Sequence, residues 1–258
     1  MSLNNVVGLI PAAGLGSRIS PVPCSKELFP VGFSEHPATG EPHPKAVSQY
    51  LLEHMQRAGA AQVYFILRKG KWDIPNYYGD GSQLNMHFAY LMMQRPYGVP
   101  YSLDQAYSFV SDKRVVFGFP DILFEPADAL PQLLQRQQET KADVVLGCFP
   151  VSNPDKWDTV ELSDDGRVEK VLPKSPSSNY KYNWAIACWG PRFTEFMHQH
   201  LQQVQKQLHE SDSELSVGEV VQAAVQGGLL VQSVCFDEGN CLDVGTPQDL
   251  QKAIRNLS

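Results

Sequence analysis

The sequence has no excess of positive charge and no long hydrophobic run. Among its 258 residues, 21 lysines and arginines stand against 28 acidic residues, so the formal net charge is -7. Nucleic-acid-binding domains usually carry a clustered basic surface, and a membrane helix needs about 20 consecutive apolar residues. The first residues, MSLNNVVGLIPAAG, also lack the basic region and apolar core of a secretory signal. We therefore expect a soluble, cytoplasmic protein that binds neither nucleic acid nor membranes.

Cysteine is also scarce. The five cysteines are odd in number, contain no CxxC pair and lie far apart, at Cys24, Cys148, Cys188, Cys235 and Cys241. A disulfide framework or a zinc knuckle needs paired and closely spaced cysteines. We therefore predict reduced thiols that pack as small apolar side chains.

Short apolar runs alternate with helical patterns through the first 150 residues. Predicted helices over 46–58, 103–110 and 130–140 separate predicted strands over 6–11, 63–67, 86–93, 114–119 and 143–149. Strands that alternate with helices form parallel sheets covered on both faces. Ligands bind beyond the carboxyl ends of such strands, so we expect the site at the loops after Ile10 and Phe119.

The pattern changes after residue 150. Two short runs on either side of an Asp-Asp-Gly turn predict a hairpin over 159–162 and 168–172. A loop rich in Pro and Ser over 173–179 is expected above a site. The remaining pattern predicts strands over 185–189 and 229–236, and helices over 193–208, 220–225 and 246–256. We expect one Rossmann-like α/β domain over 1–258, with a mainly parallel, mixed sheet and two halves, 1–150 and 151–258.

The most informative stretch is PAAGLGSRISPVPCSKELFPVG, residues 11–32. Gly14 and Gly16 follow a buried strand, and glycines let the backbone N–H groups approach a phosphate chain. Arg18 and Lys26 supply positive charge beside that loop. The third glycine of a dinucleotide-binding fingerprint and the Gly-Lys-Ser/Thr of a Walker loop are both missing. A glycine-rich turn in another kind of α/β protein is the alternative interpretation.

The strings IPAAGLGSR and SKELFPV resemble the signature of the sugar-1-phosphate nucleotidyltransferases, and most closely that of their uridylyltransferase branch. The resemblance implies a glycosyltransferase-A-like nucleotidyltransferase fold. It also implies that a nucleoside triphosphate lies against Ala13, Gly14, Gly16 and Ser17, and that Arg18 and Lys26 hold its phosphates. Ser25 stands where the family usually has a proline.

The resemblance continues in QRPYGVPYSLDQA. Gln94 matches the glutamine that reads the pyrimidine base, and a glutamine amide suits the imide edge of uracil or thymine. Ser102 falls in the segment that closes over the nucleotide, at a position where the family more often has glycine. A solvated glutamine in a loop is the alternative for Gln94.

Two aspartates match the metal ligands of the family. Asp121 lies in GFPDILF at the end of a predicted central strand, and Asp243 lies in CLDVGTP. The resemblance implies that both bind Mg²⁺, a hard cation whose remaining positions are filled by phosphate oxygens and water. Helix-capping or turn roles are the alternatives.

The acceptor side departs from the family pattern. Lys174 matches the lysine that holds the sugar phosphate, but Pro173 stands where a glutamate that reads sugar hydroxyls is expected. Glu169 and Lys170 form a rival match, so either Lys174 or Lys170 is the candidate. Asn183 and Trp184 fall where the family lines the sugar pocket.

The implied reaction transfers a nucleotidyl group from a nucleoside triphosphate, with UTP or dTTP favoured, to a sugar 1-phosphate. The products are a nucleotide sugar and pyrophosphate. Arg18, Lys26, Asp121 and Lys174 are the implied catalytic residues, and the family implies a possible homo-oligomer. Two alternatives stay open: a non-sugar acceptor such as phosphocholine, and a catalytically silent nucleotide-binding regulator.

Overall fold

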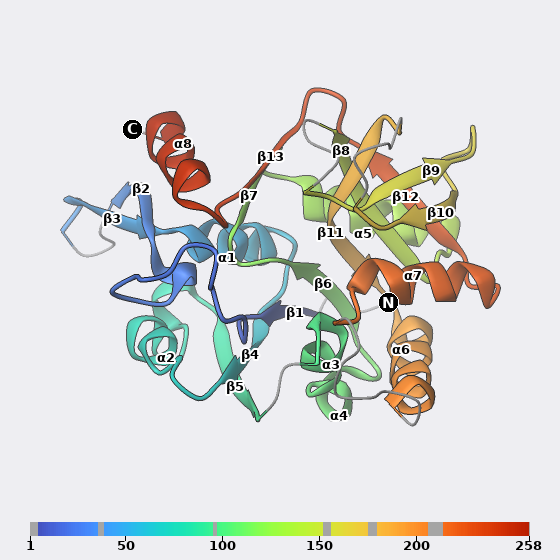
Figure 1. The fold of residues 1–258 in the computed structure, drawn as a ribbon, viewed down its shortest axis with the longest axis horizontal. Coiled ribbons are helices and arrows are strands. Elements are labelled where there is room, and N and C mark those ends of the chain that lie inside the picture. Colours follow the sequence, from blue (N-terminus) through green and yellow to red (C-terminus); the bar gives the residue numbers. More distant parts are fainter. Residues whose placement is uncertain are drawn as a thin grey trace.

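The computed structural model describes residues 5–35, 39–94, 97–151, 156–174, 180–205 and 214–257. Its centre is a nine-stranded mixed sheet (Figure 1). The first half of the chain forms one side of this sheet, where four strands run parallel in the order β6, β1, β4, β5: Arg114–Gly118, Val6–Pro11, Gln62–Arg68 and His87–Met93. The predicted alternation of strands and helices therefore produces the predicted parallel arrangement.

The second half of the chain extends the sheet with antiparallel pairs. Strand β11, Tyr182–Trp189, runs antiparallel to β6 and to β8, Val144–Pro150. The expected hairpin forms as β9, Thr159–Leu162, and β10, Val168–Leu172, beside β11. Strand β12, Val231–Cys235, pairs with β8 in parallel. The predicted mixed α/β fold is thus confirmed.

Helices cover both faces of the sheet because its strands are apolar on both sides. In β1, Val7 and Leu9 face one core, and Val6 and Ile10 face the other. The first core is closed by α3 (Val99–Asp104), α6 (Pro191–Gln205) and α7 (Val217–Gln226). The second is closed by α1 (Val47–Arg57), α2 (Asp73–Tyr78) and α5 (Ala129–Thr140).

Several elements differ from the sequence prediction. The single helix predicted over 103–110 is wrong: α3 begins at Val99 and a separate α4 covers Tyr107–Val110. Pro100 suits the first turn of α3, which explains the early start. Between the two helices, the N–H groups of Gln105 and Ala106 donate to the carbonyls three residues earlier. This is the hydrogen-bond pattern of a 3-10 turn, and it ends α3 before α4 begins.

Two small sheets were not predicted. A hairpin joins β2, Pro30–Glu35, to β3, Pro42–Ala46, and β7, Ile122–Glu125, pairs with β13, Asn240–Asp243. Helix α8, Pro247–Leu257, follows β13. In the predicted helix 193–208 and loop 173–179, residues 206–208 and 175–179 lie outside the described residues. In the described part of the chain, no helix has the length and apolar character to cross a membrane.

Candidate active site

The glycine loop leaves the carboxyl end of β1 and stands over the parallel half of the sheet. Its backbone adopts a left-handed conformation at Gly16, with φ +64°, which favours glycine. The side chain of Ile19 anchors the loop in a small core with Phe29 and Val244. Gly14, Ser17 and Arg18, by contrast, are exposed, and Ala13 before them is buried. The loop is therefore fixed at its base and open to a ligand at its tip.

Lys26 lies against this loop. A Cβ atom placed on Gly14 or Gly16 would stand 4.0 Å from Cε or 3.8 Å from Cδ of Lys26. The lysine begins the short 3-10 helix Lys26–Leu28, directly after Ser25. Its amine donates to Asp121 Oδ2 at 2.5 Å, and both side chains are largely buried. Burial, the largest single effect, lowers the pKa of the Lys26 amine, but the carboxylates of Asp121, Glu27 and Asp243 together raise it above its ordinary value.

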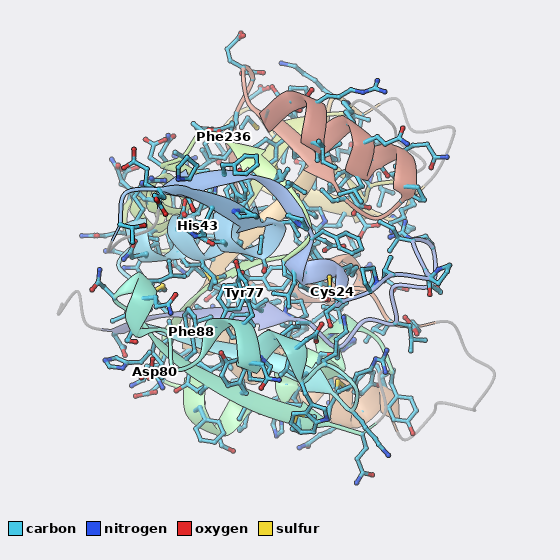
Figure 2. The ribbon with its side chains drawn as sticks, turned by 90° about the vertical axis from the view of Figure 1, so that its left-hand side faces the viewer. Cys24, His43, Tyr77, Asp80, Phe88 and Phe236 are labelled. Carbon is cyan, nitrogen blue, oxygen red and sulfur yellow. The ribbon has the colours of Figure 1, made fainter. Side chains whose placement is uncertain are left out.

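Buried polar contacts hold the turn that carries Lys26. The backbone N–H and the hydroxyl of Ser25 donate to the Asp73 carboxylate at 2.6 and 2.7 Å. Lys71 donates to Glu27 Oε2 at 2.6 Å, and these two side chains are 6% and 2% exposed. Ser48 donates to the backbone carbonyl of Glu27 at 2.6 Å. Figure 2 views the molecule from this side, with Cys24 of the loop and Tyr77 of α2 labelled.

The two-stranded sheet of β7 and β13 brings the two aspartates together. Asp243 pairs in register with Ile122, and the N–H of Val244 donates to the carbonyl of Asp121 at 2.8 Å. Arg18 Nη2 lies 3.7 Å from Asp243 Oδ2. Burial and the neighbouring Asp121 carboxylate raise the pKa of Asp243 to about 6, against the opposing effects of Arg18 and Lys26. Two carboxylates that repel each other in a partly buried site form a favourable binding site for a cation.

The donor atoms fit a hard divalent cation. Asp121 and Asp243 offer carboxylate oxygens, and Gly245 leaves the space beside Asp243 open, since a Cβ there would stand 2.8 Å from Oδ1. The described residues contain no group of three or more His, Cys, Asp or Glu side chains that could hold a metal by themselves. Proteins commonly bind Mg²⁺ through one or two carboxylates, and substrate phosphates and water complete its coordination.

A cavity of about 240 Å³ joins these groups. Its wall contains six of the residues selected from the sequence: Arg18, Lys26, Asp121, Lys174, Trp184 and Asp243. The sequence pattern missed eight further wall residues, among them Lys156, Trp157, Asp158 and Ser216. Lys156 donates to both carboxylate oxygens of Asp249 at 2.9 Å. Three of these four are consecutive in the loop before β9 and Ser216 caps the start of α7, and none belongs to a motif of fixed spacing in the sequence.

The structure separates the two candidate acceptor lysines. Lys174 lies in the cavity wall. Lys170 donates to Glu161 Oε2 across the β9–β10 hairpin at 2.7 Å, and its side chain is 57% exposed. Only Lys174 of this pair shares the cavity with Asp121 and Asp243.

The other selected residues lie outside the described cavity wall: Ala13, Gly14, Gly16 and Ser17 of the glycine loop, and Gln94, Ser102 and Asn183. Gln94 is exposed at the end of β5. The Ser102 hydroxyl is buried and donates to Met93 Sδ at 3.0 Å. Asn183 is buried, with Nδ2 3.5 Å from Cys241 Sγ. On β11 it faces the opposite side from its neighbour Trp184, as alternation along a strand requires.

The open α/β sheet places a glycine loop, the side chains of Arg18 and Lys26 and two carboxylates beyond its strand ends, where ligands of such sheets commonly bind. The chain belongs to the Nucleotidyl transferase family, whose sequence profile matches residues 7–258. Its fold is the glycosyltransferase-A-like nucleotidyltransferase fold.

Relatives and solved structures agree with this membership. The chain is 24% identical over 252 residues to the low-salt glycan biosynthesis nucleotidyltransferase Agl11 of Haloferax volcanii, covering 95% of this chain and 64% of Agl11. It is 26% identical over 255 residues to a glucose-1-phosphate thymidylyltransferase of Streptomyces antibioticus, covering 96% of this chain and 65% of that protein. The chain thus spans less than two thirds of the length of either relative.

A crystal structure of a Bacillus anthracis protein assigned as a glucose-1-phosphate thymidylyltransferase, in complex with sucrose, superimposes with a TM-score of 0.81. The match covers 98% of this chain and 95% of the other at 18% identity. At this identity, the similarity shows a shared fold.

Proposed function

We propose that the protein transfers a nucleotidyl group from a nucleoside triphosphate, UTP or dTTP, to a sugar 1-phosphate. The products are a nucleotide sugar and pyrophosphate. The observation that carries this proposal is one cavity wall that contains Arg18, Lys26 and Lys174 together with Asp121 and Asp243. The names of the relatives support the sugar-phosphate class, because they include a glucose-1-phosphate thymidylyltransferase and a glycan biosynthesis nucleotidyltransferase.

The reaction needs no protein nucleophile. A phosphate oxygen of the acceptor attacks the α-phosphorus of the triphosphate, and the bond from that phosphorus to the pyrophosphate oxygen breaks. The main work of the protein is to hold two anions in line against their mutual repulsion. Arg18 and Lys26, beside the glycine loop, bind the triphosphate, and Lys174 binds the acceptor phosphate. Lys26 then exchanges its contact with Asp121 for a phosphate oxygen.

Asp121 and Asp243 are the residues that would hold Mg²⁺. When bound, this ion supplies positive charge that stabilises the negative charge developing on the phosphates.

The remaining assignments are part of the same proposal. Residues 1–150 bind the nucleotide and residues 151–258 bind the acceptor. Ala13, Gly14, Gly16 and Ser17 contact the nucleotide, while Gln94 and Ser102 contact its base, and Asn183 and Trp184 belong to the sugar side. We place the reaction in the cytoplasm, where nucleoside triphosphates are made, and a homo-oligomer stays a prediction.

The test is pyrophosphate release by the purified protein with Mg²⁺. UTP, dTTP, CTP, ATP and GTP are each combined with a panel of sugar 1-phosphates and with phosphocholine, and Asp121→Asn serves as the blank. We expect release with UTP or dTTP and a sugar 1-phosphate, and none from the blank. Release with phosphocholine alone would identify a non-sugar acceptor. Binding of triphosphates without release from any pair would identify a nucleotide-binding regulator.

A further inference from the structure

The cavity contains a third carboxylate that the proposed chemistry does not use. Asp158 lies just before β9, and its backbone carbonyl accepts from the N–H of Trp184 on β11 at 3.3 Å. Asp121 and Asp243 sit with Lys26 and Arg18, whereas Asp158 sits with Lys174 and the start of α7. This acid therefore belongs to the acceptor side of the cavity.

The surroundings of Asp158 hold its carboxylate in place. The backbone N–H of Lys174 donates to it, and the charge of Lys174 lies near it. Gly218 in the first turn of α7 packs directly against Oδ2, and a Cβ at that position would collide with the carboxylate. Burial, the largest effect, and the nearby Glu219 raise the pKa of Asp158 despite Lys174. A carboxylate in a partly buried wall is a strong hydrogen-bond acceptor.

The residue before Lys174 cannot accept a hydrogen bond through its side chain. Pro173 has no polar side chain, and it lines a neighbouring cavity of about 250 Å³, whereas Asp158 lines both cavities. Among the described residues that line the first cavity, Asp158 is thus the acid beside the candidate phosphate-binding lysine.

We propose that Asp158 is a specificity-determining residue that accepts a hydrogen bond from a ring hydroxyl of the sugar 1-phosphate bound at Lys174. This inference rests on the proposed function. A carboxylate bonded to the main chain of Lys174 is well placed for a hydroxyl near the phosphate-bearing carbon. Asp158 shares this wall with the positive charge of Lys174, which favours a neutral hydroxyl over a second cationic group as its partner.

The test uses Asp158→Ala and the isosteric Asp158→Asn in the pyrophosphate-release assay, with Asp165→Asn in the exposed hairpin turn as the matched control. Asp158→Ala should raise the KM for the sugar 1-phosphate about 10- to 100-fold. Asp158→Asn should raise it less, because the amide oxygen still accepts a hydrogen bond. The KM for the nucleotide should stay unchanged in both. Thermal unfolding of each variant shows whether it is folded.

A series of acceptors that each lack one ring hydroxyl sharpens the test. For one member of the series, Asp158→Ala should no longer weaken binding relative to the wild type, since the lost partner is already missing. An unchanged acceptor KM in both variants would overturn the proposal and leave Asp158 a structural role. Equal losses in Asp158→Ala and Asp158→Asn, confined to phosphocholine, would overturn it in favour of a cation contact. Failure of the proposed function would be separate, because the wild type would then release no pyrophosphate with any sugar.

Discussion

Two lysine–glutamate pairs of almost equal length, one in each half of the chain, have opposite surroundings. Lys71 and Glu27 are 2.6 Å apart and 6% and 2% exposed, whereas Lys170 and Glu161 are 2.7 Å apart and 57% and 33% exposed. The first pair includes Glu27, the neighbour of Lys26, and holds the turn that carries Lys26. The second pair lies on the surface of the β9–β10 hairpin that precedes Lys174. Removing one member of a buried ion pair leaves the other as an uncompensated buried charge, whereas an exposed ion pair contributes little to the free energy of unfolding.

The same contrast distinguishes the two sides of the proposed site. The nucleotide side matches the family motif and is held by buried contacts from Ser25, Glu27 and Ser48. The acceptor side departs from the motif at Pro173 and contains Asp158 in its wall. We infer that the fold keeps the triphosphate geometry rigid and allows the acceptor chemistry to vary in a few wall residues. Each of the following predictions tests a part of this comparison.

Loss of a phosphate-binding charge should have the largest effect. Lys26→Gln should lower kcat/KM about 100-fold or more, because the developing phosphate charge loses a fixed cation. Lys174→Gln should cause a similar loss that appears mainly in the KM for the acceptor. Steady-state kinetics with each substrate varied in turn checks both, with Lys170→Gln as the control. A rise in nucleotide KM in Lys174→Gln, with the acceptor KM constant, would contradict the division into two sides.

The two lysine–glutamate pairs should differ clearly in stability. Glu27→Gln should lower the free energy of unfolding by about 3 kcal/mol, because it leaves the Lys71 charge buried without its partner. Glu161→Gln, the same substitution in the exposed pair, should cause no measurable change. Urea unfolding monitored by tryptophan fluorescence compares the two. Adding Lys71→Met to Glu27→Gln should recover most of the loss, and a failure to recover would show that the pair itself is not the cause.

The carboxylates of the candidate metal site should reduce the stability of the metal-free protein. The pKa of Asp243, raised to about 6 in the folded chain, means that ionising this group opposes folding as the pH rises from about 4 to 6. Asp243→Asn should therefore be more stable than the wild type by about 2 kcal/mol at pH 8. The difference should shrink at pH 5, where the native carboxyl is mostly protonated. Unfolding in EDTA at both pH values measures it; equal differences would contradict the shifted pKa.

Base recognition should show the smallest effect. Gln94 is exposed at the end of β5, so Gln94→Ala should leave the fold intact and raise the nucleotide KM about tenfold. Discrimination between UTP and CTP should fall at the same time. The assay compares kcat/KM for the two nucleotides, with the exposed Gln135→Ala as the control. Unchanged discrimination would place base recognition elsewhere.

Local patterns in the sequence predict the regular elements well. The apolar run at 6–11 and the two runs around the Asp-Asp-Gly turn become β1, β9 and β10 with the expected bounds. Short elements stabilised by distant partners are not predictable in this way. Strands β7 and β13 have four residues each, and Pro42 and Pro44 obscure β3.

The candidate site shows the same limit. A motif with fixed spacing identifies Arg18 and Lys26, and the structure adds their contacts. Asp158 is a single aspartate before a short strand, and its significance comes from Lys174 beyond the following hairpin and from Gly218 on a later helix. No local pattern contains that relation.

The pairing of β7 with β13 also has a kinetic consequence. Asn240 pairs with Glu125 and Asp243 with Ile122, so the chain must close a loop of more than a hundred residues to bring the two aspartates together. Contacts of such long sequence separation form slowly, because loop closure costs entropy before the contact is made. We expect the parallel strands β1, β4 and β5, whose pairing partners lie closer together in the sequence, to assemble first and the carboxylate pair to form late. Recovery of activity during refolding should then lag behind recovery of secondary structure.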